Sequence, residues 1–457
     1  MADSAAVEIP GAAGTELIYG LEDRPPFRET LFVALQHVFA VFVGIITPPL
    51  IICNALKLDR ANTVFLVSMS LFVSGVATLL QSRGIGPIGS RLLSIQGTSF
   101  VFLGPIITTA GLSISTGASP RTALGIIFGL CLAGSTVAIT ISQCIRLASR
   151  IITPLVTGTV VTLIGLTLIE VGITTMGGGF DAKRDGSFGS PLNLVLSGLV
   201  LTSIVILNAS GMPLLRMTSV VLGLAIGYLA AFLLGKVDLG GLRELPLVTI
   251  PFPLHYGLGF NAGAFLPFAF LYLITVIESV GDLTATSSLT NQPITGDLYF
   301  RRLRSGILAD GINSLLAAIF NSFPSTTFAQ NNGVIQLTGV GSRYVGTFIA
   351  VILMALGVFP AVGGLVQALP QAVLGGATIV MFGAVAVAGI RILAGVRMNR
   401  RASIIIAVSI GLGLGVTFVP DILHFLPELL RHTLSSGIAT GGMCALLLNT
   451  VLPGERE

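Results

Sequence analysis

Long apolar runs constrain the fold of this chain more than any other feature of its sequence. Runs of about 17–25 residues that carry almost no charge recur along the 457-residue chain, and each is long enough to cross a bilayer as a helix. Only 10% of the residues are charged, whereas a soluble globular domain has about 25%. The sequence therefore predicts an all-α membrane protein that crosses the bilayer many times.

Fourteen spans are predicted, and two of them are interrupted. The third span begins with the polar residues 94–99, and the tenth, 329–341, is too short to cross as a helix. Gln96 and Gln330 mark these two spans and are 234 residues apart, a separation close to that between the starts of the first and eighth spans. We therefore expect two inverted seven-span repeats, each with an interrupted third span that combines a short strand with a half-helix. The predicted spans lie near residues 30–53, 62–81, 94–111, 122–145, 152–174, 191–208, 217–235, 264–285, 304–321, 329–341, 344–365, 371–390, 402–420 and 433–451.

The distribution of basic residues predicts the orientation in the membrane. With the N-terminus inside the cell, sixteen Lys and Arg residues fall on the cytoplasmic side and eight on the other side. Cytoplasmic loops of membrane proteins carry such an excess. We expect residues 1–28 and 453–457 to be cytoplasmic tails, and the polar first segment does not have the pattern of a signal peptide.

A polar, glycine-containing segment, residues 326–339, contrasts with this apolar chain. It places four carboxamide side chains within seven residues, at Gln330, Asn331, Asn332 and Gln336. An unpaired amide in hydrocarbon costs several kcal/mol, so the segment must pack against protein or line a wet cavity. Carboxamides offer both donors and an acceptor, which suits a planar, uncharged, hydrogen-bonding solute better than a metal or a phosphate.

Two carboxylates lie in the predicted eighth span. Glu278 and Asp282 are four residues apart and therefore project from one face of a helix. Charged groups inside a membrane are costly and usually mark a substrate, ion or proton pathway. Burial and mutual repulsion both favour a protonated carboxyl group, so one of the two could hold a proton near neutral pH. The alternative interpretation is a pair at the membrane edge that meets solvent.

Four further residues have both a functional and a structural interpretation. Asp310 is a candidate for the site, and the alternative is a carboxylate that caps a helix or pairs with an arginine of the cluster 301–304. His37, in the first span, either shapes the site or is a packed core histidine. Phe100 and Phe328 flank the two interrupted segments, where stacking on a flat ligand is an alternative to ordinary packing in the core or against lipid.

The sequence predicts no cofactor and no enzyme activity. The four cysteines and four histidines show no spacing typical of metal ligands. No nucleophile with a neighbouring base stands out, and nucleic-acid binding is not suggested, because the basic residues lie in short loops.

The residues that follow Phe328 resemble a family signature. Gln330-Asn331-Asn332-Gly333, four further residues and Thr338-Gly339 are similar to the signature of the nucleobase–ascorbate transporter family, also called nucleobase–cation symporter 2. Glutamine at its first position resembles the xanthine and uric acid permease branch, whereas uracil permeases carry glutamate there. The resemblance covers nearly the whole chain and includes the segments 21–27, 36–37, 94–100, 278–282, 309–311, 342–346 and 452–454.

This resemblance implies a homodimer in which each chain has two domains. The core domain would contain spans 1–4 and 8–11, which correspond to residues 29–146 and 261–366. The gate domain would contain spans 5–7 and 12–14, which correspond to residues 147–260 and 367–452.

The resemblance also implies roles for single residues. Glu278 and Gln330 would bind the edge of a purine, with the aromatic rings near its faces. The implied substrate-binding residues are Glu278, Gln330, Phe100, Ser99, Phe328 and Ala329. The residues implied in proton coupling or support of the site are Asp282, Asp310, Asn331, His37 and Gln96. Xanthine-selective bacterial members often have Asn where this chain has Ser99, and members that accept urate tend to have a smaller residue, so we expect xanthine, urate or both as substrate.

We therefore predict a proton-coupled symporter of the bacterial inner membrane that imports xanthine or uric acid by alternating access. The alternatives are a permease for uracil or another nucleobase, an anion exchanger or channel of the same architecture, and a membrane-embedded enzyme or receptor. An anion site would need a basic residue, and spans 3, 8 and 10 have none in their middles. An enzyme would need a catalytic constellation, which the sequence does not offer.

Overall fold

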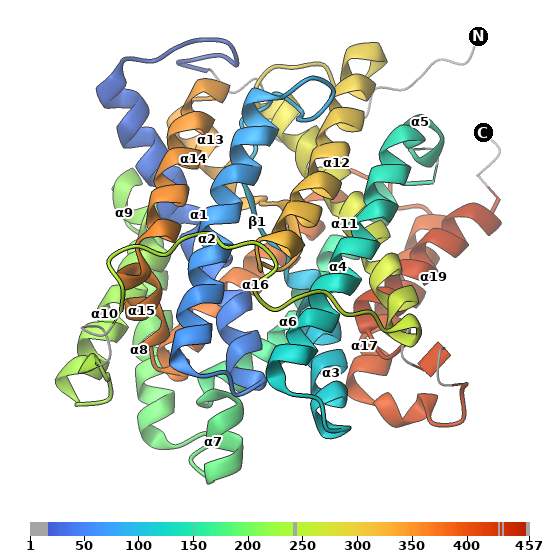
Figure 1. The fold of residues 1–457 in the computed structure, drawn as a ribbon. Helices are drawn as coiled ribbons and strands as arrows, with labels where there is room; N and C mark the ends of the chain where they lie inside the picture. Colours follow the sequence, from blue (N-terminus) through green and yellow to red (C-terminus); the bar gives the residue numbers. More distant parts are fainter. Residues whose placement is uncertain (1–16, 150, 241–244, 428–429, 432–433, 454–457) are drawn as a thin grey trace.

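The computed structural model describes residues 17–149, 151–240, 245–427, 430–431 and 434–453. The predicted tails, 1–28 and 453–457, therefore lie partly outside the described residues. Helices run side by side through the molecule, and the first described residues and the end of the last helix lie on the same side of it (Figure 1).

Nearly all of the secondary structure is helical, as predicted. The helices are α1 (Phe27–Ala55), α2 (Arg60–Arg83), α3 (Leu103–Ser115), α4 (Pro120–Gln143), α5 (Ile145–Ala148), α6 (Pro154–Met176), α7 (Gly179–Asp185), α8 (Pro191–Asn208), α9 (Pro213–Met217), α10 (Ser219–Leu233), α11 (Ala262–Leu289), α12 (Gly296–Ile319), α13 (Gln330–Thr338), α14 (Arg343–Val358), α15 (Pro360–Gln367), α16 (Gln371–Ala394), α17 (Arg400–Phe418) and α19 (Gly437–Val451). The short 3₁₀ helices η1 (Phe100–Phe102) and η3 (Pro420–Leu423) and the strands β1 (Gln96–Thr98) and β2 (Ser325–Thr327) complete the described elements.

Many of these helices are suited to a membrane. Within the described residues, eight helices are long and apolar enough to cross it, or nine if the bent pair α14 and α15 counts as one span. Three shorter apolar helices cover residues 100–115, 219–233 and 437–451. The structure thus confirms a polytopic membrane protein, while the number of fourteen spans and the inverted repeat stay predictions.

Two predicted spans differ most from the observed helices. The helix α12 begins at Gly296, eight residues before the predicted start at 304, because a helix can continue past the apolar run into a polar, arginine-bearing turn. The predicted span 344–365 is two helices, α14 and α15, that meet at an angle of 74°. Pro360 begins the second of them and lacks the N–H group that would continue the first helix.

Short polar motifs decide where several helices begin. Ser119, Thr153 and Ser190 each accept a hydrogen bond from the backbone amide three residues further on, and a proline follows each of them. These side chains satisfy an amide that the first helical turn leaves free, and the fixed φ of proline suits the first helical position. The same pattern therefore starts α4, α6 and α8.

The two strands are the main departure from a helical bundle. They are buried and pair with each other in antiparallel register, with Gly97 opposite Thr326. Each strand leads into a short helix, α3 or α13, at the two places where the sequence predicts interrupted spans. Because no water is available in the membrane interior, each strand satisfies the backbone groups that the other exposes.

The helices form two groups by their packing. In one group, α2 packs on α14 and α4 packs on both α11 and α12. In the other group, α6 packs on α16, α17 on α19, and α8 on α10. The contacts of α11 with α6 are among those that join the two groups.

Candidate functional site

The paired strands bring together segments that are more than two hundred residues apart. Besides the pairing within the strands, the Phe328 amide donates to the carbonyl oxygen of Ile95 at 3.0 Å, and the Ser99 amide donates to that of Pro324 at 2.8 Å. The start of α13 and the start of η1 are thereby fixed relative to each other. Neither helix receives a side-chain cap from the residue that precedes it.

The predicted pair of carboxylates lies beside these strands. The Asp282 side chain accepts a hydrogen bond from the hydroxyl group of Thr327 on β2, at 2.9 Å. Glu278 is half-buried, and among the described residues its Oε2 atom has no hydrogen-bond partner. Asp282 and Asp310 are close enough to repel a charge on Glu278. The two carboxylates of α11 therefore differ, because Asp282 is hydrogen-bonded to Thr327, whereas Glu278 lies beside Thr326 of the same strand and keeps one oxygen, Oε2, without a partner among the described residues.

Asp310 serves as a structural link between three helices. It is buried in α12 and accepts hydrogen bonds from Ser279 on α11 and from Gln81 on α2, whose Nε2 lies 3.2 Å away. The arginines of the cluster do not pair with it: Arg302 donates to Gln292, and Arg304 donates to a glutamine at the end of α4. The arginine alternative for this carboxylate is therefore wrong, because the helix carries these side chains to other partners.

Of the four carboxamides of α13, two hold the helix, Gln336 is exposed, and Gln330 is free. Asn331 is buried and its side chain donates to the Leu93 carbonyl oxygen at 2.6 Å. The Asn332 side chain accepts from Thr286 on α11 at 2.7 Å. Gln330, the first residue of the helix, is half-buried, and among the described residues its side chain has no hydrogen-bond partner. This side chain is therefore free to bind a solute.

Gln96 and His37 lie deeper in the protein. Gln96 is fully buried next to Asp310, and its Oε1 accepts from Ser325 at 3.4 Å, whereas its Nε2 makes no hydrogen bond of standard geometry within the described chain. His37 is fully buried in α1 next to the Asn331 side chain, although neither ring nitrogen makes a hydrogen bond of standard geometry within the described chain. Gln96 is thus part of β1 itself, and His37 lies beside α13.

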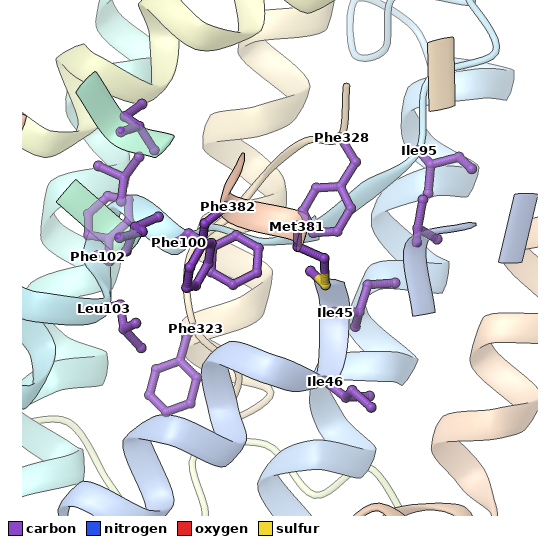
Figure 2. Packing of buried hydrophobic residues seen from close by; sticks show 14 of the residues in the cluster. Ile45, Ile46, Ile95, Phe100, Phe102, Leu103, Phe323, Phe328, Met381 and Phe382 are labelled. Carbon is purple, nitrogen blue, oxygen red and sulfur yellow. The ribbon is translucent and has the colours of Figure 1, made fainter. Parts of the chain in front are cut away.

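The two predicted phenylalanines pack in different ways. The ring of Phe328 lies over Gly97, where an added Cβ atom would come within 2.4 Å of it. The ring of Phe100 meets that of Phe382 on α16 edge to face, with the ring centroids 5.1 Å apart, and Figure 2 shows the Met381 side chain beside this cluster. Phe100 thus joins the two groups of helices at the end of β1.

Two small residues complete the surroundings of these rings. Ser99 is buried, and its hydroxyl group has no hydrogen-bond partner among the described residues. Ala329 is half-buried and precedes α13. The structure therefore places Ser99 and Phe100 at the end of β1, and Phe328, Ala329 and Gln330 at the end of β2.

A cavity of about 820 Å³ leads along α3 to this region. Its wall follows the helix from Phe100 at one end to Thr116 at the other, and α6, α11 and residues 435–438 line its other sides. The cavity separates the two groups of helices at this place, with Phe100 among its lining residues.

Sequence reasoning missed two residues that shape the site. Gln81 holds Asp310, and its Oε1 also accepts from the Ser90 amide at 2.9 Å. It is a single polar residue near the end of an apolar span, so no local pattern distinguishes it from a polar residue at the membrane edge. Phe382 lies in an ordinary apolar helix and gives no sequence signal at all.

The fold and the site together define a membrane transport protein. A polar cluster lies inside a bundle of apolar helices, where two strands and two short helices interrupt the spans. Two solved structures have the same fold. The transmembrane domain of a cyanobacterium bicarbonate transporter, BicA, is 15% identical with a TM-score of 0.58 and covers 88% of this chain and 99% of its own. The structure of SLC26A9 is 11% identical with a TM-score of 0.61 and covers 93% of this chain and 66% of its own.

The chain belongs to the permease family Xan_ur_permease, whose model matches residues 28–422. Xanthine permease XanP of Escherichia coli (strain K12) is 50% identical over 445 residues, which cover 97% of this chain and 96% of the relative. Xanthine permease XanQ of the same strain is 46% identical over 442 residues, 97% of this chain and 95% of the relative. A xanthine permease of Bacillus subtilis (strain 168) is 35% identical and covers 94% of each chain. The resemblance stated from the signature is confirmed, and the chain is a transporter and not an enzyme.

Proposed function

We propose that this permease imports xanthine, and also uric acid, together with protons by alternating access. The relatives named xanthine permease match nearly the full length of the chain. The observation that carries the proposal is that the Glu278 Oε2 atom and the Gln330 carboxamide, next to the paired strands, have no hydrogen-bond partner among the described residues. Buried polar groups normally have partners, so a polar solute is the natural partner for these two.

The chemistry of xanthine fits this pair. A carboxylate is an acceptor only and would bind ring N–H groups, whereas a carboxamide can pair with a neighbouring C=O and N–H edge. Phe100 and Phe328 would lie near the faces of the ring, with Ser99 and Ala329 lining its surroundings. An analogue that lacks one of the bound groups would leave a buried polar atom unpaired, and the site would reject it strongly.

Uptake of labelled xanthine by cells that express the Glu278→Gln variant tests this binding mode. Loss of a hydrogen bond to a charged group costs about 1.5–3 kcal/mol, which corresponds to a loss of about 10- to 100-fold in kcat/KM. Asp421→Asn is the matched control, because Asp421 is exposed in η3 and should transport like the parent. Full transport by Glu278→Gln at equal membrane levels would reject the assignment of Glu278.

We also propose the division into a core domain, residues 29–146 and 261–366, and a gate domain, residues 147–260 and 367–452. The two groups of helices found by packing support this division. The free groups belong to the core domain, while Phe382 and Met381 come from the gate domain. Movement of the core against the gate would then open the site to each side of the membrane in turn.

Proton coupling is a separate proposal. Asp282 and Asp310 lie near Glu278, Gln96 is part of β1, and His37 lies next to Asn331 of α13. In liposomes that contain the purified protein, we expect an inwardly directed proton gradient to accelerate xanthine uptake, and a protonophore to abolish this acceleration. Equal uptake with and without the gradient would remove coupling from the proposal while leaving xanthine transport in place.

The membrane arrangement completes the proposal. We propose fourteen spans in two inverted repeats, cytoplasmic termini, a bacterial inner membrane location and a homodimer. The antiparallel pairing of β1 with β2 supports the inverted relation, and the described ends on one side of the molecule support an even number of spans (Figure 1).

Anion exchange is disfavoured. The likeness to BicA and SLC26A9 concerns the fold alone, because the identities are 15% and 11%. The charged residues found next to the strands are the carboxylates Glu278, Asp282 and Asp310, which can accept hydrogen bonds from purine N–H groups but offer no positive charge to a small inorganic anion.

A further inference from the structure

The residues before α1 pair with the far end of the signature helix α13. Residues 18–23, called the strap below, run beside the connection 339–343 between α13 and α14 (Figure 1). The Ile18 amide donates to the carbonyl oxygen of Gly339 at 2.8 Å. The Tyr19 amide donates to the same oxygen at 3.3 Å, and the Gly341 amide donates to the Tyr19 carbonyl oxygen at 2.9 Å, which together form a parallel bridge between Tyr19 and Val340. The Arg343 amide donates to the Leu21 carbonyl oxygen at 3.0 Å.

Side chains fasten the strap to the same connection. Two nitrogens of the Arg343 guanidinium donate to Glu22 Oε2, at 2.6 and 2.9 Å. The Ser342 hydroxyl donates to the Asp23 carbonyl oxygen at 2.5 Å. The Leu21 side chain is 4% exposed, which anchors the strap in the protein. The contact includes residues 21–23 and 342–343, which belong to two segments of the family resemblance, 21–27 and 342–346, and substrate binding explains neither of them.

The position of the strap matters because α13 is short. The helix has nine residues, and an isolated helix of this length is not stable in water. Its orientation therefore depends on what holds its ends. Asn331 and Asn332 hold the end that carries Gln330, and the strap holds the other end at Gly339, which has φ of 65° and terminates the helix.

We propose that the strap is a positioning element for substrate binding, in which Glu22 and Arg343 act as positioning residues. By fixing the end of α13 at Gly339, the strap sets where Gln330 stands at the opposite end, about 13 Å away at 1.5 Å per residue. This inference rests on the proposed role of Gln330. It predicts that loosening the strap weakens binding of xanthine without a loss of folded protein.

Four variants of the full chain test the proposal. Ile18→Pro removes the shorter of the two hydrogen bonds that the strap donates to the Gly339 carbonyl oxygen, and Ile18→Ala is its control, since this side chain is 70% exposed. Glu22→Gln removes the negative charge of Glu22 and thereby the ion pair with Arg343. The double variant Glu22→Arg with Arg343→Glu restores an ion pair with the charges exchanged.

Two readouts separate positioning from a merely structural role. We expect Ile18→Pro and Glu22→Gln to raise the KM for labelled xanthine about 3- to 10-fold, with the membrane level and the maximal rate within about twofold of the parent. Ile18→Ala and the charge-exchanged double variant should each have a KM within about twofold of that of the parent. Hydrogen–deuterium exchange of the purified proteins should be faster in residues 330–341 of the two loosened variants and unchanged in α17.

Every outcome bears on the proposal. Unchanged exchange in residues 330–341 overturns the strap as a support of α13. Faster exchange with an unchanged KM overturns the positioning role and leaves only a structural one. If the parent does not transport xanthine but exchange still rises in the loosened variants, the proposed function fails, and the support of α13 stands.

Discussion

Single side chains in the polar cluster divide into those that hold the protein together and those that remain free. Asp282 is bound to Thr327, and Asp310 is bound to Ser279 and Gln81. In contrast, Glu278, Gln330, Gln96 and Ser99 each have a side-chain polar atom without a hydrogen bond of standard geometry to another described residue. An unpaired buried polar group costs about 1–3 kcal/mol, so a site that leaves several of them unpaired gains stability when a ligand binds.

Ser99 offers a test of substrate range at this scale. Its hydroxyl group is buried and unpaired at the end of β1, next to Phe100. We expect Ser99→Asn to weaken inhibition of labelled xanthine uptake by urate at least about 10-fold, because the larger side chain takes the space that the additional oxygen of urate needs.

Competition assays with urate and unlabelled xanthine measure this change. Inhibition by unlabelled xanthine should change by less than about threefold and serves as the internal control. Equal weakening for both purines would mean that Ser99 affects the site in general and not the choice of substrate.

At the scale of elements, the close packing of β1 on the ring of Phe328 decides the geometry of the site. Gly97 has no side chain, and the Phe328 ring occupies the space where a Cβ atom would lie. Figure 2 shows this ring near Met381 and Ile45, so that it has neighbours from α16 and α1. The crossing of the strands therefore depends on one glycine as well as on backbone hydrogen bonds.

Gly97→Ala should impair transport strongly, by about 10-fold or more in kcat/KM. A methyl group at 2.4 Å from the ring must displace either Phe328 or β1, and overpacking of this kind costs about 1–3 kcal/mol. Labelled xanthine uptake, normalised to the membrane level, measures the effect. Gly111→Ala is the control, because an added Cβ atom on this residue of α3 meets nothing within 4 Å. Partial recovery in Gly97→Ala with Phe328→Leu would assign the loss to this contact, and parental transport by Gly97→Ala would contradict it.

At the scale of the whole molecule, the proposed movement requires the two groups of helices to separate. The helices α11 and α6 meet at Gly281 and Thr157, where a Cβ atom added to the glycine would lie 2.7 Å from the side-chain Cγ2 of the threonine. A fixed link at this place would prevent core and gate from moving past each other.

The pair Thr157→Cys and Gly281→Cys, in a chain without its four native cysteines, provides this link. The Sγ atom of a cysteine at position 157 can take the place of Cγ2, next to the Cβ atom of a cysteine at position 281. This proximity suits a disulfide bond, which needs a short distance between the two Cβ atoms. We expect oxidation to reduce xanthine uptake at least about 10-fold, and a reductant to restore it. Each single cysteine variant is the control for the substitutions themselves. Full transport by the oxidised pair, with the bond verified by mass spectrometry, would contradict movement between these helices.

The sequence by itself determined the membrane class, the two interrupted segments and the residues Glu278 and Gln330 as candidates. Transfer free energy and helical spacing are local properties, so an apolar run or two carboxylates four residues apart can be recognised without a structure. Tertiary structure alone decided that Gln81 binds Asp310, that Phe382 meets Phe100 and that the strap pairs with residues 339–343. These contacts join residues far apart in the chain, and each side chain has an ordinary local sequence around it. Only the packing of the helices determines which of them become partners.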